Sequence, residues 1–372
     1  MKGSVKKDGA SWCYIVDLGK DANNKRKQKK KRGYKTKKEA QLALAEVIHE
    51  LSKGTYVIPT KTKFKDYLQQ WLEDKQTKVK KGTLDTYTWL TKLHIIPALG
   101  DIELTSLTPM MLQQHYNFLT KNEVLSDENI RKVHILIKDA LKKAERWGLV
   151  ARNIAALVDA PKVSKKEIRV WDADDVLKFL EVAKHSPYYM IFLLAITTGM
   201  RKGEILGLQW KYINFEDGYL SVAQVFNKHE NKLVPGAKTK AGIRTIDLPD
   251  ETVQGLIEYK DLIDVRKQRA AAIYQDFDLV NCSPTGTPID PSNVTRTFKE
   301  LTKKAGLLDI RFHDLRHTHA TLLLKQGVHP KIVAERLGHA DTRMTLDTYS
   351  HLLPSMQKET AKNFGKMLFG TT

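Results

Sequence analysis

Two short polar connectors constrain this chain most strongly, because a single hydrophobic core cannot extend across them. The first covers residues 54–61 and contains the helix breaker Pro59, and the second covers residues 160–169 and is rich in charged side chains. A chain of 372 residues corresponds to two or three domains at roughly 100–200 residues per domain. We therefore expect three units, at residues 1–55, 62–155 and 166–372.

The first unit is expected to be a small α+β domain. Residues 11–18 combine aromatic and β-branched side chains, which is typical of a strand, and residues 19–24 favour a turn. The basic run at residues 25–34 is either a disordered segment or part of the sheet, and its aromatic and helical flanks favour the sheet. Thr36 can cap a helix from residue 37 to about residue 51.

The second unit is expected to be all-helical. Phe64, Leu68 and Trp71 belong to an apolar stripe with helical spacing. Further helices are expected to begin near Thr83, at Thr108-Pro109 and at Ser126 or Asp127, and Gly148 ends the last of them.

The third unit is expected to be mainly α-helical with a small antiparallel sheet. Asp172 or Asp174 can cap its first helix, and residues 188–198 form a uniformly apolar helix that ends at Gly199. Residues 218–226 and 243–248 alternate in polarity and predict strands, and the pattern from Pro291 onward is mostly helical.

The charge of the chain indicates a polyanionic partner. The 62 Lys and Arg residues against 43 Asp and Glu residues give a net charge of +19, and residues 1–60 alone hold 15 basic and 6 acidic residues. Nucleic acid is the leading candidate, because neutralised phosphates supply most non-specific affinity; solvated lysines on a basic soluble protein are the alternative. The candidate DNA contacts are Lys25, Arg26, Lys27, Lys29, Lys30, Lys31 and Arg32 in the first unit, and Lys80, Lys81, Arg131 and Lys132 in the second.

Several protein classes are disfavoured by composition. No apolar run reaches the ~18 residues of a membrane span, so no membrane association is expected, and the first residues lack the apolar segment of a secretory signal. Only Cys13 and Cys282 are present, which excludes a disulfide framework and a four-cysteine zinc site. A reducing cytoplasm is the expected compartment.

Two segments of the third unit suggest an anion site. Arg201 follows the glycine-terminated helix and begins the next one, where backbone N–H groups and the guanidinium can face an anion, and Glu204 lies one turn further on. Lys238 and Lys240 lie at a turn between two expected strands, from which a lysine can reach into a cleft. Taken alone, the first segment is better explained by a surface ion pair and the second by an exposed hairpin lysine.

Two later segments add histidine and tyrosine. His313 and Arg316 are three residues apart on an expected helix and share a face, a pairing that suits a phosphodiester. His313 and His317 also have the i, i+4 spacing of metal ligands, but no carboxylate has the matching spacing. His339 follows a glycine at a turn, and Tyr349 comes ten residues later.

In this order the four segments resemble the tyrosine recombinase, or phage integrase, family, whose pattern is Arg, Lys, His-x-x-Arg, His, Tyr. The matching residues are Arg201, Lys240, His313, Arg316, His339 and the nucleophile Tyr349, with Glu204 as the supporting acid. Lys240 fits better than Lys238 because of its four-residue spacing to Arg244. The resemblance covers the whole chain and implies an arm-site-binding domain, a helical core-site-binding domain and a catalytic domain of the recombinase fold, as in lambda-type and conjugative-transposon integrases.

The resemblance implies integration and excision of a phage or mobile element through a 3′-phosphotyrosine intermediate. Arg201 and Arg316 would stabilise the charged transition state, His313 and His339 would assist, and Lys240 would protonate the leaving 5′-oxygen. No metal, ATP or other cofactor is required. The implied partners are double-stranded DNA at arm and core sites, three further protomers in a tetramer, and accessory DNA-bending or excision factors. In the family, tails like residues 350–372 pack on a neighbouring protomer; packing on the tail's own core is the alternative.

Three other functions remain to be distinguished. A catalytically idle DNA-binding regulator would keep the basic units and lack strand cleavage. A type IB-like topoisomerase would share the nucleophile and the clustered charges, but would relax supercoils without a fixed site. A metal hydrolase would lose its activity in EDTA.

Overall fold

The computed structural model describes residues 3–20, 26–52, 61–164, 168–236, 244–349, 361–362 and 364–370. Its contacts divide the chain into two units, Met1–Lys165 and Lys166–Thr372. Within the first unit, residues 3–52 and residues 61–164 hold separate hydrophobic clusters, one around Tyr14 and Val16 and one around Tyr67 and Trp71. The division into three domains stays a prediction.

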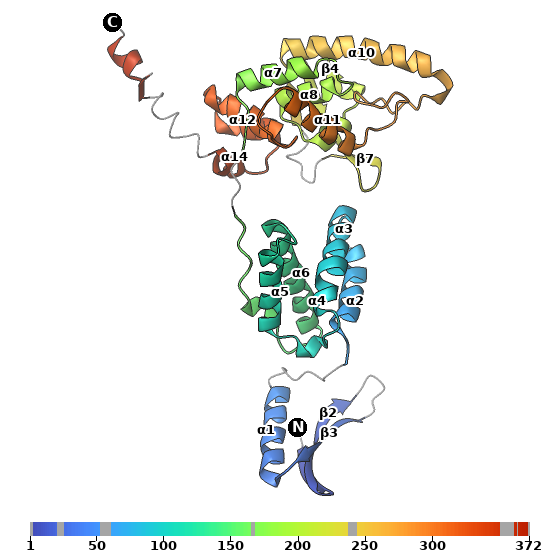
Figure 1. The fold of residues 1–372 in the computed structure, drawn as a ribbon, viewed down its shortest axis with the longest axis vertical. Coiled ribbons are helices and arrows are strands. Elements are labelled where there is room, and N and C mark those ends of the chain that lie inside the picture. The colour runs from blue at the N-terminus through green and yellow to red at the C-terminus, as the bar shows by residue number, and fades with distance from the viewer. Residues whose placement is uncertain are drawn as a thin grey trace. The chain divides into compact units, whose positions relative to one another are not determined.

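The N-terminal part is a three-stranded antiparallel sheet with one helix (Figure 1). Strands β1 (Gly3–Asp8), β2 (Ser11–Lys20) and β3 (Arg26–Tyr34) lie in that order, and α1 (Lys37–Ser52) packs on them. Tyr14 and Val16 of β2 are buried with Leu44 of α1. The predicted cap is present, since the Thr36 hydroxyl accepts a hydrogen bond from the Glu39 amide at 3.2 Å.

The basic run lies in strand β3, and its side chains alternate between the two faces of the sheet. Lys30 and Arg32 both pair with Asp8 of β1, at 3.1 and 2.8 Å. Lys31 instead lies 6.0 Å from the ring centre of Tyr34, which packs against the core beneath α1. Lys30 and Arg32 therefore lie on the face of the sheet away from α1, called the open face below, and Lys31 lies on the opposite face. Lys29 is half-buried; Arg26 and Lys27 belong to β3 but their side chains, and Lys25 entirely, lie outside the described residues.

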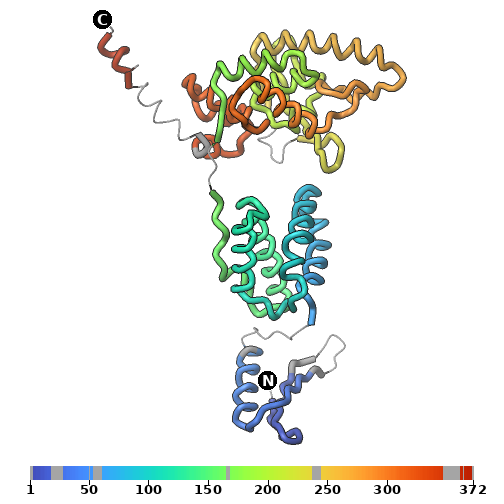
Figure 2. The backbone as a smooth tube through the Cα atoms, in the orientation of Figure 1, coloured from blue at the N-terminus to red at the C-terminus, as the bar shows by residue number. Residues whose placement is uncertain are grey.

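Residues 61–164 are all-helical, as predicted, and Figure 2 traces their path. The elements are α2 (Phe64–Gln76), α3 (Lys81–Leu90), the π-helical segment η1 (Thr91–Ile95), α4 (Ile96–Leu99), η2 (Leu104–Ser106), α5 (Pro109–Lys121), α6 (Asp127–Arg146) and η3 (Ile154–Leu157). The apolar stripe of α2 is buried, and the Tyr67 hydroxyl donates to the Ala140 carbonyl of α6 at 2.6 Å. The candidate DNA contacts of this part, Lys80, Lys81, Arg131 and Lys132, are all exposed.

Residues 168–349 form a helix-rich unit with two small antiparallel sheets, one ordered β4-β5-β8 and the other β6-β7. The elements are α7 (Ala173–Ala183), α8 (Tyr189–Thr198), α9 (Lys202–Leu206), η4 (Trp210–Tyr212), β4 (Ile213–Asn214), β5 (Tyr219–Val222), β6 (Gln224–Asn227), β7 (Lys232–Pro235), β8 (Arg244–Asp247), α10 (Asp250–Ala270), η6 (Ala271–Ile273), α11 (Pro291–Lys304), α12 (Asp314–Lys325), α13 (Pro330–Leu337) and α14 (Thr342–Tyr349).

Helix α8 lies at the centre of this unit because it is apolar on every side. Its Phe192 packs with Phe179 of α7 and Phe298 of α11. Helix α7 begins at the predicted cap, Asp172, in a reciprocal capping box with Asp175. The predicted fold class, a multidomain and mainly helical chain with small antiparallel sheets, is confirmed. Within the described ranges no helix has the length and apolarity needed to cross a membrane.

Candidate active site

The first part of the site is the turn between α8 and α9. Gly199 adopts a left-handed conformation with φ of 66° and ends α8, as predicted. Arg201 is then the N-cap residue of α9, and Glu204 accepts hydrogen bonds from the Arg201 backbone amide at 2.9 Å and from its guanidinium at 2.8 Å. The Arg201 side chain is still 40% exposed, so it can reach a ligand while its carboxylate partner holds it.

Glu204 also binds a second arginine, from the sheet. Its carboxylate accepts hydrogen bonds from the Arg244 guanidinium at 3.0 and 3.4 Å, and the Arg244 and Glu204 side chains are 7% and 2% exposed. Burial alone would raise the pKa of Glu204, but the hydrogen bond and charge of Arg244, followed by those of Arg201, lower it. The acid is therefore an anion that joins α9 to β8.

Arg316 is held between two backbone carbonyls. It donates to the Gly199 carbonyl at 2.8 Å and to the Leu337 carbonyl at 2.6 Å, and the residue is 4% exposed. One of these carbonyls lies two residues before Arg201 and the other lies two residues before His339. The guanidinium thus links the chain segments that supply two other candidate residues.

The two predicted histidines lie near these arginines. His313 is an exposed residue, but desolvation of its ring, followed by the charges of His317 and Arg316, lowers its pKa to about 4. Burial, followed by the charges of Arg316 and Arg201, lowers the pKa of His339 to about 4 as well. Both imidazoles are therefore neutral at pH 7. His313 is the N-cap residue of α12, and its ring contacts that of His317 edge-on, with 5.4 Å between the ring centres.

His339 connects the site to the helix that bears Tyr349. Its Nδ1 lies 2.8 Å from the hydroxyl of the buried Thr345, which belongs to α14, one turn before Tyr349. Tyr349 is the last residue of α14; its side chain lies outside the described residues, as do Lys238 and Lys240. The structure therefore brings together Arg201, Glu204, His313, Arg316 and His339.

Sequence reasoning missed three residues of this network. Arg244 was used only to choose between Lys238 and Lys240 and was given no role of its own. It shares a face of β8 with the buried Ile246, which is an unusual place for an arginine. His319 is 6% exposed, and Arg336 donates to its Nε2 at 3.2 Å. The helical spacing of His319 from Arg316 could have indicated that the two side chains share a face of one helix. Two partners of Arg336 are 89 and 139 residues away along the chain, and no sequence pattern connects residues so far apart.

The chemistry of the cluster suits a tetrahedral oxyanion. Guanidinium groups bind phosphate oxygens through several N–H groups, and neutral imidazoles add hydrogen bonds without repelling the cations. Among the described residues no group of three or more His, Cys, Asp or Glu side chains is placed to hold a metal ion.

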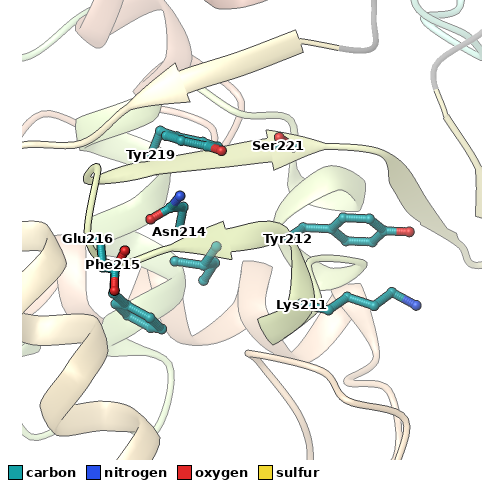
Figure 3. A pocket seen from close by; sticks show the side chains of 8 residues that line it. Lys211, Tyr212, Asn214, Phe215, Glu216, Tyr219 and Ser221 are labelled. Atoms are coloured by element: carbon teal, nitrogen blue, oxygen red, sulfur yellow. The ribbon is translucent and has the colours of Figure 1, made fainter.

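A separate hollow of about 570 Å³ lies on the β4–β5 sheet. Lys211, Tyr212, Asn214, Phe215 and Tyr219 are among the residues that line it (Figure 3). None of the clustered residues described above lines this hollow.

Three family models match successive parts of the chain. The model described as the phage integrase family matches residues 169–356, an arm DNA-binding domain model matches residues 4–51, and a model of the N-terminal SAM-like domain of phage integrases matches residues 63–120. These matches follow the same order as the three predicted units.

Curated relatives and solved structures are similar over most of the chain. A tyrosine recombinase XerC-like protein of Caldanaerobacter subterraneus is 28% identical over 96% of both chains, and the ICEBs1 integrase of Bacillus subtilis is 27% identical over 66% of this chain and 67% of its own. The Tn1549 transposon integrase, solved in complex with transposon right end DNA, has a TM-score of 0.67 at 21% identity and covers 80% of this chain and 98% of its own. A lambda integrase dimer bound to a COC′ core site has a TM-score of 0.58 at 21% identity, over 92% and 93%. These structures share the fold of this chain.

Proposed function

The chain belongs to the phage integrase family and is a tyrosine-type site-specific DNA recombinase, and from this premise we propose which of its residues carry out strand exchange. Arg201 and Arg316 bind the non-bridging oxygens of the scissile phosphate. The Tyr349 phenol loses its proton to solvent, and its oxygen attacks the phosphorus to form a 3′-phosphotyrosyl ester. The bond from phosphorus to the 5′-oxygen breaks, and the 5′-oxygen takes a proton from Lys240. A 5′-hydroxyl from another strand then gives its proton to Lys240 and attacks the ester. The bond from phosphorus to the Tyr349 oxygen breaks, the phenolate regains a proton from solvent, and the exchange is complete.

The arrangement around Arg316 is the single observation that supports this proposal best. Two carbonyls fix its guanidinium between the turns that bear Arg201 and His339. Donors that are fixed before the reaction stabilise developing charge without reorganisation, and this is often the largest catalytic contribution. Arg201 is preorganised in the same way by Glu204.

The proposed roles of the histidines follow from their protonation states. His313 and His339 are neutral at pH 7, so each can donate a hydrogen bond to a phosphate oxygen from one ring nitrogen. If the ring donates from Nε2, the Nδ1 of His339 accepts from the Thr345 hydroxyl. A bound phosphate would raise the pKa of both rings, so either can also share a proton with a departing oxygen.

Double-stranded DNA is the proposed partner of all three parts. The N-terminal sheet would bind an arm site through Lys30 and Arg32, and the helical part would bind a core site near Lys80, Lys81 and Arg131. The basic excess of residues 1–60 and the DNA complexes of the Tn1549 and lambda integrases support this proposal. We further propose a tetramer on DNA, with accessory bending or excision factors, acting to integrate and excise a mobile element within a cytoplasm.

A suicide DNA substrate tests the nucleophile. The substrate carries a nick near the cleavage point, so that the cut strand diffuses away and the protein–DNA ester accumulates. Wild-type protein and the control variant Tyr219→Phe, altered in the hollow on the β4–β5 sheet, should form the adduct equally. Both should do so in EDTA as well as with Mg²⁺. Tyr349→Phe should bind the same DNA and form none. An adduct that persists with Tyr349→Phe would exclude this nucleophile, and no adduct from wild type would favour a non-catalytic regulator.

A further inference from the structure

Arg336 of α13 forms hydrogen bonds to three other segments of the unit at residues 168–349, called the catalytic unit below. Its guanidinium donates to His319 Nε2 of α12 at 3.2 Å, to the Thr197 carbonyl of α8 at 3.1 Å and to the Asp247 carbonyl of β8 at 2.9 Å. Its own backbone carbonyl accepts a 2.6 Å hydrogen bond from Arg244. Arg336 of α13 therefore contacts three other segments from which the site is built: α8, α12 and, through two hydrogen bonds, β8.

Two of these contacts, and Arg336 itself, lie within four residues of a candidate site residue. Thr197 is four residues before Arg201, His319 is three residues after Arg316, and Arg336 is three residues before His339. Arg244, bound by the Arg336 carbonyl, holds Glu204, which holds Arg201. A movement of Arg336 would thus alter the distances between the groups that are proposed to surround the phosphate.

His319 connects Arg336 to α8 through one hydrogen bond at each of its two ring nitrogens. Because Arg336 donates to Nε2, that nitrogen must be an acceptor, and Nδ1 carries the proton that is donated to the Ile196 carbonyl at 2.8 Å. The ring also lies against the turn that precedes Arg201: a Cβ on Gly199 would come within 2.7 Å of His319 Cδ2. The space between α8 and α12 is therefore filled by an imidazole of fixed tautomer.

We propose that Arg336 is a positioning residue for strand cleavage, which acts through His319 and Arg244 to set the separation of the Gly199 and Leu337 carbonyls that clamp Arg316. This inference rests on the proposed function, since the group being positioned is the one proposed to bind the scissile phosphate. Arg336 itself need not touch DNA. Its loss should slow the chemical step and leave DNA affinity nearly unchanged.

The test measures the single-turnover rate of adduct formation on the suicide substrate with saturating full-length protein, alongside the Kd for the same DNA. Arg336→Met should slow adduct formation on the order of 10- to 100-fold, the cost of a misplacement of about 1 Å, and change Kd less than about threefold. Arg269→Met is the matched control, because it removes one exposed positive charge from the last turn of α10. Arg336→Lys, which keeps the charge and can keep part of the bonding, should recover part of the rate.

A double-mutant cycle with His319 separates positioning from general damage. His319→Phe alone leaves the Arg336 Nε–H without its partner, whereas the Arg336→Met/His319→Phe variant removes both polar groups, so the combined loss of rate should be smaller than the product of the single losses. The proposal would be overturned if Arg336→Met formed the adduct at a rate within twofold of that of Arg269→Met. It would also be overturned if Arg336→Met lost rate and DNA affinity by equal factors and the rate losses in the cycle simply multiplied. If Arg336→Met does not fold, a His319→Phe rate within twofold of Arg269→Met overturns it.

The controls also separate this inference from the proposed function. If wild type and Arg269→Met form an adduct that Tyr349→Phe does not form, the proposed function stands. The rates of adduct formation by the Arg336 variants then test this inference alone. If wild type forms no adduct, both fall together.

Discussion

Replacing Glu204 by Gln should destabilise the catalytic unit more than any surface charge substitution. The substitution keeps the shape of the side chain but removes the charge that neutralises Arg244, and both side chains of that pair are less than a tenth exposed. Leaving a buried charge without its partner costs about 3–5 kcal/mol, and we expect about 3 kcal/mol because the amide oxygen can still accept one hydrogen bond. For a unit of this size that corresponds to a fall of about 6–12 °C in Tm.

The assay is thermal unfolding of the full chain by calorimetry, with Glu230→Gln as the control. Glu230 pairs with Lys232 at 2.8 Å, but the Lys232 side chain is 61% exposed, so we expect a loss below about 1 kcal/mol. The difference between the two variants should persist in high salt, because a buried pair is screened weakly. Adding Arg244→Met to Glu204→Gln should restore stability in part, since the uncompensated charge is then gone.

The result that would refute this reasoning is a Glu204→Gln transition that shifts no more than that of Glu230→Gln. A second contradiction would be a double variant whose losses simply add. In either case Glu204 would not be the anion that joins α9 to β8, and the preorganisation of Arg201 would need another source.

Three further predictions concern pH, backbone and salt. Burial, followed by the charge of Arg336, lowers the pKa of His319 to about 3, so between about pH 6.5 and pH 3 the imidazole is protonated only in the unfolded chain. The free energy of unfolding is therefore highest above pH 6.5 and falls on acidification, by about 2 kcal/mol at pH 5. In urea unfolding, His319→Gln should reduce the difference in stability between pH 7 and pH 5. Stability that rises on acidification would contradict this sign. Gly199→Ala should cost about 2–5 kcal/mol in the same unfolding experiment, because the new Cβ would lie 2.7 Å from both His319 and Leu337 at a φ of 66°; a loss under 1 kcal/mol would mean that the turn relaxes freely. Lys30→Gln and Arg32→Gln should each reduce the slope of log K against log salt for arm-site DNA by about 1, and an unchanged slope would remove the open face of the sheet from the interface.

The sequence predicted those parts of the fold that depend on local patterning. The stripe from Phe64 to Trp71 and the uniformly apolar α8 are helices whose burial follows from their spacing. Strand β1 was not expected, because its only strong apolar residue is Val5 and its pairing with β2 supplies what its own sequence lacks. The π-helical segment at Thr91–Ile95 likewise has no marker in the sequence, since its residues continue the helical pattern of α3.

In the predicted site, too, contacts between residues close in sequence could be predicted, and contacts between distant residues could not. Arg201 and Glu204 are close in sequence, so their i, i+3 contact followed from the spacing alone. The clamp on Arg316 joins carbonyls that are 117 and 21 residues away, and no periodicity connects them. Arg244 and Arg336 belong to the same long-range network and were missed for that reason. Lys240 and the Tyr349 phenol stay predictions, because their side chains lie outside the described residues.

Mass spectrometry of the trapped adduct tests the proposed nucleophile most directly. Nuclease treatment followed by trypsin should leave a nucleotide on the peptide of residues 344–358, with the modification on Tyr349, the one tyrosine in that peptide. The released DNA strand should carry a 5′-hydroxyl. A nucleotide on any other side chain, or a 5′-phosphate on the released strand, would contradict the account.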